Sequence, residues 1–146
     1  MVIILRGVSG SGKSTATARY NPDLVVSADH FMVDKEGRYN FDVTRLSECH
    51  SKCLLTFLDF VASHSNDSIV VVDNTNTTLW ETSPYVQSGN ALGHVVKVIS
   101  LLSDPEVAAA RNQHGVPPAT VFSQDQRLRS SCLEIPSHWN HEVLNV

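Results

Sequence analysis

The chain has 146 residues, of which 42% are hydrophobic and 18% are charged, and its formal net charge is −4. These values are typical of one globular domain and exclude an intrinsically disordered chain, while the acidic balance argues against a protein that coats duplex nucleic acid through a broadly basic surface. No apolar stretch reaches the roughly 20 residues that cross a bilayer, and the first residues lack the features of a signal peptide, so we expect a soluble cytoplasmic protein.

Strands and helices are predicted to alternate along the chain. The strands are expected at runs of consecutive apolar residues: Val2–Leu5, Leu24–Val26, Ile69–Val72 and Val95–Leu101. The helices are expected at Lys13–Tyr20, Val43–Ser63, Leu79–Leu92, Asp104–Asn112 and Pro118–Leu128. This alternation is typical of an α/β fold with a mostly parallel sheet, and we expect one domain over residues 1–146. Residues 132–146 carry no clear pattern.

The second predicted helix has an apolar stripe that should face the core. Its members recur at intervals of three and four residues: Leu46, Cys49, Cys53, Phe57, Phe60 and Val61. Three cysteines, the third being Cys132, cannot form a fully paired disulfide framework. The spacing of Cys49 and Cys53 beside His50 fits no familiar zinc site, so we interpret the thiols as reduced and structural.

The first predicted strand is followed by the segment GVSGSGKS, residues 7–14, which matches the phosphate-binding loop pattern in full. Its glycines let backbone N–H groups turn toward phosphate oxygens, and the next helix adds the positive end of its dipole. Lys13 is expected to neutralise the β- and γ-phosphates, and the Ser14 hydroxyl to bind Mg²⁺. The sequence therefore predicts an ATP·Mg²⁺ site whose nucleotide contacts come from Gly7, Ser9, Gly10, Ser11, Gly12, Lys13, Ser14 and Thr15.

Two aspartates follow predicted strands and should therefore lie at the same edge of the sheet as this loop. Asp29 comes just after the second strand and Asp73 ends the third. We interpret Asp29 as a general base for an acceptor hydroxyl, with a helix N-cap as the alternative. Asp73 is expected to help hold Mg²⁺, with a turn-forming role as the alternative. The chain has no Asn-Lys-x-Asp guanine-reading motif, so these carboxylates favour a kinase over a switch GTPase.

Two later helices, joined by a Gly/Pro turn, are expected to form a lid at about residues 111–128. Arg111 and Arg127 are the candidates to stabilise charge on the transferred phosphoryl group, with Arg129 competing for the second position.

In these motifs the chain resembles the polynucleotide-kinase-like P-loop kinases. The carrying segments are the phosphate loop, SADHF, GRYNFD, VVVDNTNTTLWETSPYV and ARNQHGVP, over roughly residues 2 to 130. The family includes the 5′-kinase domain of phage polynucleotide kinase and small phage kinases that modify 5-hydroxymethyluracil in DNA; a phage protein would act in the host cytoplasm. The resemblance implies a P-loop kinase fold with a helical lid. It also implies that Lys13, Ser14, Asp29, Asp73 and Arg111 act as described above.

The acceptor is less clear from the sequence. Where phage end-kinases carry an arginine three residues past the base, this chain has Met32, and its lid looks shorter. In GRYNF, Arg38 could bind a phosphate while Tyr39 and Phe41 stack on a base, or the aromatics could pin the loop onto the core. Further candidates for acceptor contact are Asn74, Asn76 and Trp80.

We therefore expect phosphorylation of a hydroxyl on DNA, and favour the hydroxymethyl group of 5-hydroxymethyluracil over a 5′-hydroxyl end. A 5′-polynucleotide kinase, a nucleoside or small-molecule kinase and a non-catalytic nucleotide-binding module are the alternatives.

Overall fold

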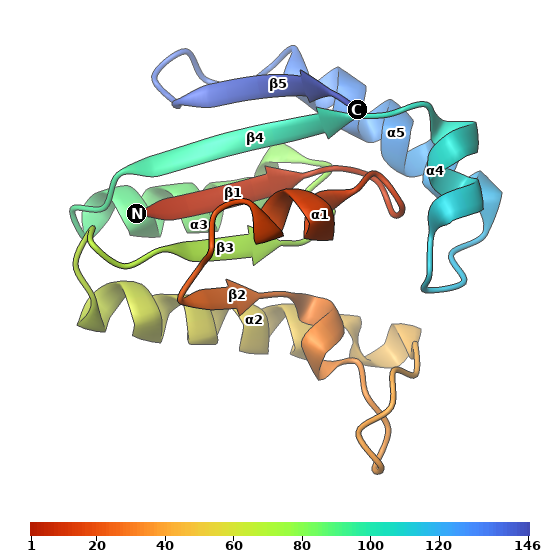
Figure 1. The fold of residues 1–146 in the computed structure, drawn as a ribbon, viewed down its shortest axis with the longest axis horizontal. Coiled ribbons are helices and arrows are strands. Elements are labelled where there is room, and N and C mark those ends of the chain that lie inside the picture. Colours follow the sequence, from red (N-terminus) through yellow and green to blue (C-terminus); the bar gives the residue numbers. More distant parts are fainter.

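The computed structural model describes residues 1–146, and its centre is a five-stranded parallel sheet (Figure 1). The strands are β1 (Val2–Arg6), β2 (Leu24–Val26), β3 (Val70–Asp73), β4 (Val96–Leu102) and β5 (His141–Asn145), in the order β2-β3-β1-β4-β5. The helices are α1 (Lys13–Ala18), α2 (Leu46–Ser63), α3 (Leu79–Ala91), α4 (Pro105–Arg111) and α5 (Pro118–Cys132), with short 3₁₀ turns η1 (Ala28–Phe31) and η2 (Val43–Arg45). This arrangement confirms the predicted α/β class and its parallel sheet.

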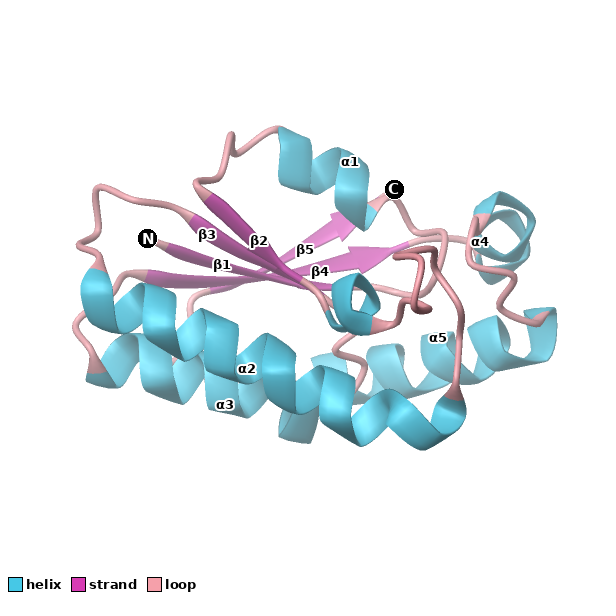
Figure 2. Ribbon diagram, turned by 90° about the horizontal axis from the view of Figure 1, so that it is seen from below, coloured by secondary structure: helices cyan, strands magenta, loops and turns pink.

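Helices cover both faces of the sheet (Figure 2). Helices α2, α3 and α5 lie on one face and α1 on the other, while α4 follows the end of β4. β1 is buried along its whole length because it pairs with β3 on one side and β4 on the other. Its uninterrupted apolar run is what a strand enclosed on both faces requires.

The predicted stripe of α2 packs into the larger core cluster. Four of its members are at most 2% exposed: Cys49, Cys53, Phe57 and Val61. Leu46 and Phe60 are partly buried against the same cluster, so the helical spacing in the sequence identified the buried face correctly. All three cysteines are free thiols.

The structure differs from the sequence prediction most at two helix ends and in one missed strand, and the other element ends agree within two residues. The helix expected from Val43 begins as the 3₁₀ turn η2 and becomes α-helical at Leu46, and α5 continues past Leu128 to Cys132. Residues 141–145, which the sequence left unassigned, form β5 parallel to β4. This strand is an edge strand with mostly exposed side chains, so it lacks the apolar run that revealed the others. None of the helices is long and apolar enough to cross a bilayer.

Candidate active site

The phosphate loop joins β1 to α1 at the carboxyl edge of the sheet, and two of its glycines are sterically required. Gly12 precedes α1 with φ of 92°, and Gly10 has φ of 83°, a region that side chains rarely adopt. A Cβ at Gly10 would also lie 2.0 Å from the carbonyl oxygen of Ala108 in α4. The loop is thus pressed against the first helix of the expected lid.

Lys13 lies beneath this loop. Its Nζ donates hydrogen bonds to the carbonyl oxygens of Gly7 (3.0 Å) and Val8 (2.9 Å). Burial lowers the pKa of Lys13, and the nearby negative charges of Asp73 and Asp29 oppose that shift. The ammonium is therefore poorly solvated and held by neutral carbonyls, and anionic phosphate oxygens would be much stronger partners for it.

Ser14 and Asp73, the two residues expected to bind Mg²⁺, are brought together. The Ser14 hydroxyl donates to Asp73 Oδ2 (3.2 Å), and the Thr17 hydroxyl contacts the same oxygen (3.4 Å). No group of three or more Asp, Glu, His or Cys side chains is gathered as a metal site. One hydroxyl and one carboxylate nevertheless fit Mg²⁺, which commonly takes its other ligands from water and substrate phosphates.

Asp29 lies exposed in the first turn of η1, after the end of β2. The residue that caps this turn is Ser27, whose hydroxyl accepts the Asp29 N–H (3.3 Å). The alternative interpretation of Asp29 as the helix cap is therefore wrong. The preceding residue, Ala28, donates its N–H to Asn74 Oδ1 (2.9 Å), which ties the turn to the end of β3.

The side chains of Asn74 and Asn76 point into the protein and not toward the surface where an acceptor could bind. Both are buried: Asn74 also donates to Cys53 Sγ (3.4 Å), and Asn76 donates to the Leu5 carbonyl (2.8 Å). Their amides hold the η1 turn and the segment after β3, so we correct the expectation that they contact the acceptor. Trp80, at the start of α3, is 83% exposed and borders a hollow along that helix.

The lid arginines differ in their freedom. Arg111 ends α4 as an exposed residue. Arg127 donates from Nε to the Thr77 hydroxyl (3.3 Å). Arg129 is engaged by the Asp125 carboxylate (2.8 Å) and the Ser103 carbonyl (3.0 Å). The structure thus favours Arg127 over Arg129 as the second arginine available to a phosphate.

Two polar residues of the site were missed by the sequence analysis. Gln124, on α5, accepts the N–H of Ser9 in the phosphate loop through its Oε1 (3.0 Å). Nothing in the local sequence marks Gln124, because its partner lies 115 residues away.

Arg6, the last residue of β1, is the second of these and is fully buried. Its guanidinium donates to the Asn76 carbonyl (2.9 Å), the Ser100 hydroxyl (3.2 Å), the Thr77 carbonyl (3.4 Å) and the Ser131 hydroxyl. Burial lowers its pKa. It joins α5 and the segment after β3 to the strand that carries the phosphate loop. In the sequence, a charged residue at the end of an apolar strand was the sign that Arg6 would be buried with polar partners.

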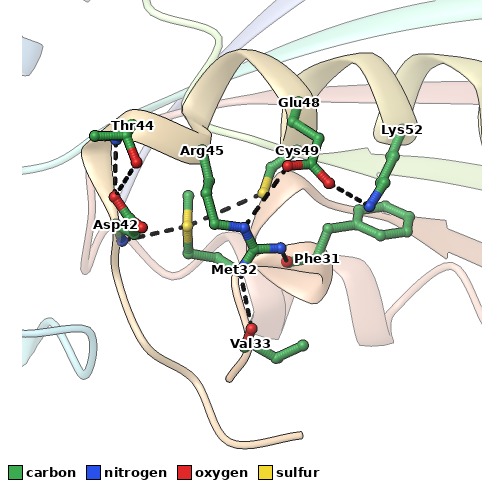
Figure 3. Close-up of polar contacts among 9 residues, drawn as sticks. All are labelled: Phe31, Met32, Val33, Asp42, Thr44, Arg45, Glu48, Cys49 and Lys52. Carbon is green, nitrogen blue, oxygen red and sulfur yellow. Dashed lines mark hydrogen bonds and ion pairs between the residues drawn. The ribbon is translucent and has the colours of Figure 1, made fainter. Parts of the chain in front are cut away.

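Residues 33–44 form an exposed loop that is anchored at its two ends (Figure 3). Arg45 donates to the carbonyl oxygens of Phe31 (3.0 Å) and Val33 (2.9 Å), on either side of Met32. Met32 itself is 1% exposed and packs toward Cys49. These contacts, rather than the loop's aromatics, attach it to the core, so the alternative in which Tyr39 and Phe41 pin it there is wrong.

The tip of this loop carries the three residues expected to bind the acceptor. Arg38 is paired with Asp34 (3.1 Å) and Glu36 (3.4 Å) within the loop, and Phe41 is 57% exposed. Tyr39 lies edge-on to His114 of the lid turn, residues 112–117, with ring centroids 4.5 Å apart. The loop and the lid turn therefore meet, although they are far apart in the sequence.

Comparison with known proteins gives a family and a fold. Residues 2–127 match the family model described as an AAA domain. Human NEDD4-binding protein 2 is 32% identical over 127 residues, which are 80% of this chain but 7% of that protein. Among solved structures, the Pnkp1/Rnl/Hen1 RNA repair complex includes a chain with TM-score 0.72 and 18% identity, covering 92% of this chain and 46% of that one. Deoxyadenosine kinase from M. mycoides has TM-score 0.61 and 13% identity, covering 99% and 90%.

Proposed function

The chain belongs to the AAA domain family, and from that premise we propose that it is an ATP- and Mg²⁺-dependent kinase that phosphorylates a hydroxyl group on DNA. One observation carries the proposal: the Lys13 ammonium is held by the Gly7 and Val8 carbonyls of the phosphate loop, and the adjacent Ser14 is hydrogen-bonded to Asp73 at the end of β3. Lys13, the Ser14–Asp73 pair and the exposed Asp29 follow or end β1, β3 and β2, so they lie at one edge of the sheet. This is the set of groups that phosphoryl transfer to an alcohol needs.

The reaction follows from these positions. Backbone N–H groups of residues 9–15 surround the phosphates, and Lys13 exchanges the carbonyls of Gly7 and Val8 for phosphate oxygens. Ser14 and Asp73 are the residues that would hold Mg²⁺, and the bound ion would supply positive charge to the phosphates. Asp29 accepts the proton of the acceptor hydroxyl as its oxygen bonds to the γ-phosphorus and the bond to the β-phosphate oxygen breaks, releasing ADP. Arg111 and Arg127 stabilise the negative charge on the transferred group.

For the acceptor, the hydroxymethyl group of 5-hydroxymethyluracil is favoured over a 5′-terminal hydroxyl. Met32 is buried against Cys49, so no side chain at this position reads a phosphate of the acceptor strand. Exposed Tyr39 and Phe41 suit stacking on a base that has left the duplex.

A nucleoside kinase is the second candidate. The fold shared with deoxyadenosine kinase over 99% of this chain favours it, as does a net charge of −4, which gives little attraction for a long polyanion. A passive nucleotide-binding module has no use for an exposed carboxylate, Asp29, at the sheet edge that carries the phosphate loop.

The test offers γ-labelled ATP and Mg²⁺ with three separate acceptors: an oligonucleotide with a blocked 5′ end and internal 5-hydroxymethyluracil, one with a free 5′-hydroxyl and ordinary bases, and a mixture of deoxynucleosides. We expect label on the first oligonucleotide. Label on the oligonucleotide with a free 5′-hydroxyl alone would identify the 5′ end as the acceptor in place of the modified base. Label on the deoxynucleosides alone would identify a nucleoside kinase. ATP binding without any labelled acceptor would contradict the proposed kinase activity.

A further inference from the structure

The contact between Tyr39 and His114 joins two segments that both extend beyond the carboxyl edge of the sheet. Their ring centroids are 4.5 Å apart and their planes differ by 83°. Tyr39 belongs to the 33–44 loop and His114 to the lid turn, so the pair bridges the acceptor side and the lid. We call these two side chains the ring pair.

Each backbone that carries the ring pair is fixed independently of it. In the loop, Asp34 accepts the N–H groups of Glu36 (3.0 Å) and Arg38 (2.9 Å), which shapes the turn below Tyr39. In the lid turn, Asn112 accepts the Val116 N–H (2.9 Å) and donates to its carbonyl (3.1 Å). Both rings are exposed, Tyr39 by 38%, so rotation of their side chains can separate them without moving either backbone.

The ring pair lies close to the proposed base. Asn40, next to Tyr39, donates its N–H to the Met32 carbonyl (2.9 Å), and the Met32 N–H donates to the Asp29 carbonyl (3.1 Å), so backbone hydrogen bonds link the segments that carry Tyr39 and Asp29. Burial, with a smaller contribution from the negative charge of Asp29, raises the pKa of Tyr39. A flat group inserted between Tyr39 and His114 would exchange their edge contact for two aromatic faces. A compact, non-planar alcohol would gain nothing from them.

We propose that Tyr39 and His114 bind the acceptor between their rings and select for a planar heteroaromatic ring whose hydroxyl is presented to Asp29. The proposal rests on the proposed kinase function and assigns the recognition of the acceptor base to these two side chains. His114 is thereby a specificity-determining residue of the lid.

The test compares Tyr39→Leu, His114→Leu and the double variant with wild type. Each single change should raise the KM for a nucleobase acceptor about tenfold, the usual scale for one lost base–aromatic stack, while the KM for ATP stays within twofold. In the double variant the KM for the acceptor should rise by less than the product of the two single increases, because both rings contact the same base. Tyr39→Phe should have the same KM for the acceptor as wild type, since it keeps the aromatic ring.

Matched controls remove an exposed aromatic and an exposed histidine elsewhere: Phe122→Leu on α5 and His50→Leu on α2. Both should leave the KM for the acceptor unchanged. Equal losses in the controls, acceptor KM within twofold of wild type in both ring-pair variants, or full multiplicativity in the double variant would overturn the proposal.

A binding measurement separates this proposal from the kinase function on which it rests. Fluorescence anisotropy of a labelled single-stranded oligonucleotide is recorded with a non-hydrolysable ATP analogue and Mg²⁺. If the wild-type protein phosphorylates nothing, but the two leucine variants bind the oligonucleotide more weakly than wild type does, the ring pair is retained and the kinase function is rejected. Unchanged binding and unchanged acceptor KM in an active wild-type enzyme would retain the kinase and reject the ring pair.

Discussion

The phosphate loop is packed against its neighbours along most of residues 7–14, whereas the 33–44 loop is anchored at its ends and exposed between them. The first is supported from inside by Lys13, from one side by α4 at Gly10 and from another by Gln124. The second is held by Met32 and Arg45 at its base and meets His114 only at its tip. A rigid cradle suits a ligand that never varies, and an exposed loop with a fixed base suits one that must be selected.

The largest effect on activity is expected from Lys13, at the centre of the phosphate loop. Lys13→Met should lower kcat/KM about 100- to 1,000-fold with every acceptor, because it removes the cation that faces the transferred phosphate. Since burial lowers the pKa of Lys13, the folded protein disfavours its charge, and the thermal midpoint should be no lower than that of wild type. Initial rates and a thermal melt check both statements. A variant that retains activity, or one that unfolds early, would contradict this role.

Asp29, the proposed general base, should matter almost as much as Lys13, but its loss should lower kcat and leave ATP affinity unchanged. Asp29→Asn should lower kcat by about a hundredfold or more and leave ATP affinity unchanged, because only proton acceptance is lost. Rates are measured at saturating acceptor, and ATP binding by calorimetry. Undiminished turnover would remove Asp29 from the mechanism.

Asp73→Asn tests the metal position next to the rigid cradle. The Mg²⁺ concentration for half-maximal rate should rise about 10- to 100-fold, because Asp73 orients Ser14 and carries the negative charge of the pair. The measurement is a Mg²⁺ titration at saturating ATP. As its control, Ser14→Thr keeps the hydroxyl and should shift the titration little, and an unshifted Asp73→Asn curve would reject the assignment.

Arg45→Lys loosens the base of the exposed loop without changing its charge. One ammonium cannot reach both the Phe31 and Val33 carbonyls, so kcat should fall about tenfold as the η1 turn with Asp29 moves. ATP KM should stay unchanged, and hydrogen exchange should rise over residues 28–45. The matched control Glu48→Gln removes the 3.7 Å ion pair of Arg45 with Glu48 and the exposed ion pair of Glu48 with Lys52, and should change kcat less than twofold. Equal effects in the two variants would make the carbonyl contacts irrelevant.

The smallest effect concerns the lid contact with the cradle. Gln124→Ala removes the hydrogen bond that ties Ser9 to α5 and should raise the KM for ATP about threefold, because the phosphate loop is then held less firmly in its binding shape. The exposed Gln126 on the same helix supplies the control, Gln126→Ala, for which KM should equal that of wild type. Steady-state kinetics with varied ATP distinguish the two, and identical values would show that the lid contact does not affect nucleotide binding.

Much of the nucleotide side could be predicted because its information is local. Eight consecutive residues at a strand–helix junction specify the phosphate loop, and consecutive apolar residues specify four strands. The position of Asp73 beside Ser14 also followed, since parallel strands end at one edge of the sheet. The anchoring of the 33–44 loop could be predicted less well. Arg45 lies inside a predicted helix, and its hydrogen bonds to the Phe31 and Val33 carbonyls leave no periodic pattern in the sequence.

By itself, the sequence determined the α/β class, the phosphate loop, the buried face of α2 and the two carboxylates at strand ends. Only the tertiary structure decided that Asn74 and Asn76 face inward, that Arg129 binds the Ser103 carbonyl, that β5 completes the sheet, and that Tyr39 meets His114. The physical reason is the range of the interactions. Hydrophobic periodicity and loop stereochemistry act between neighbours in the chain, whereas a polar or aromatic side chain takes its partner from whatever segment the packed sheet and helices bring beside it.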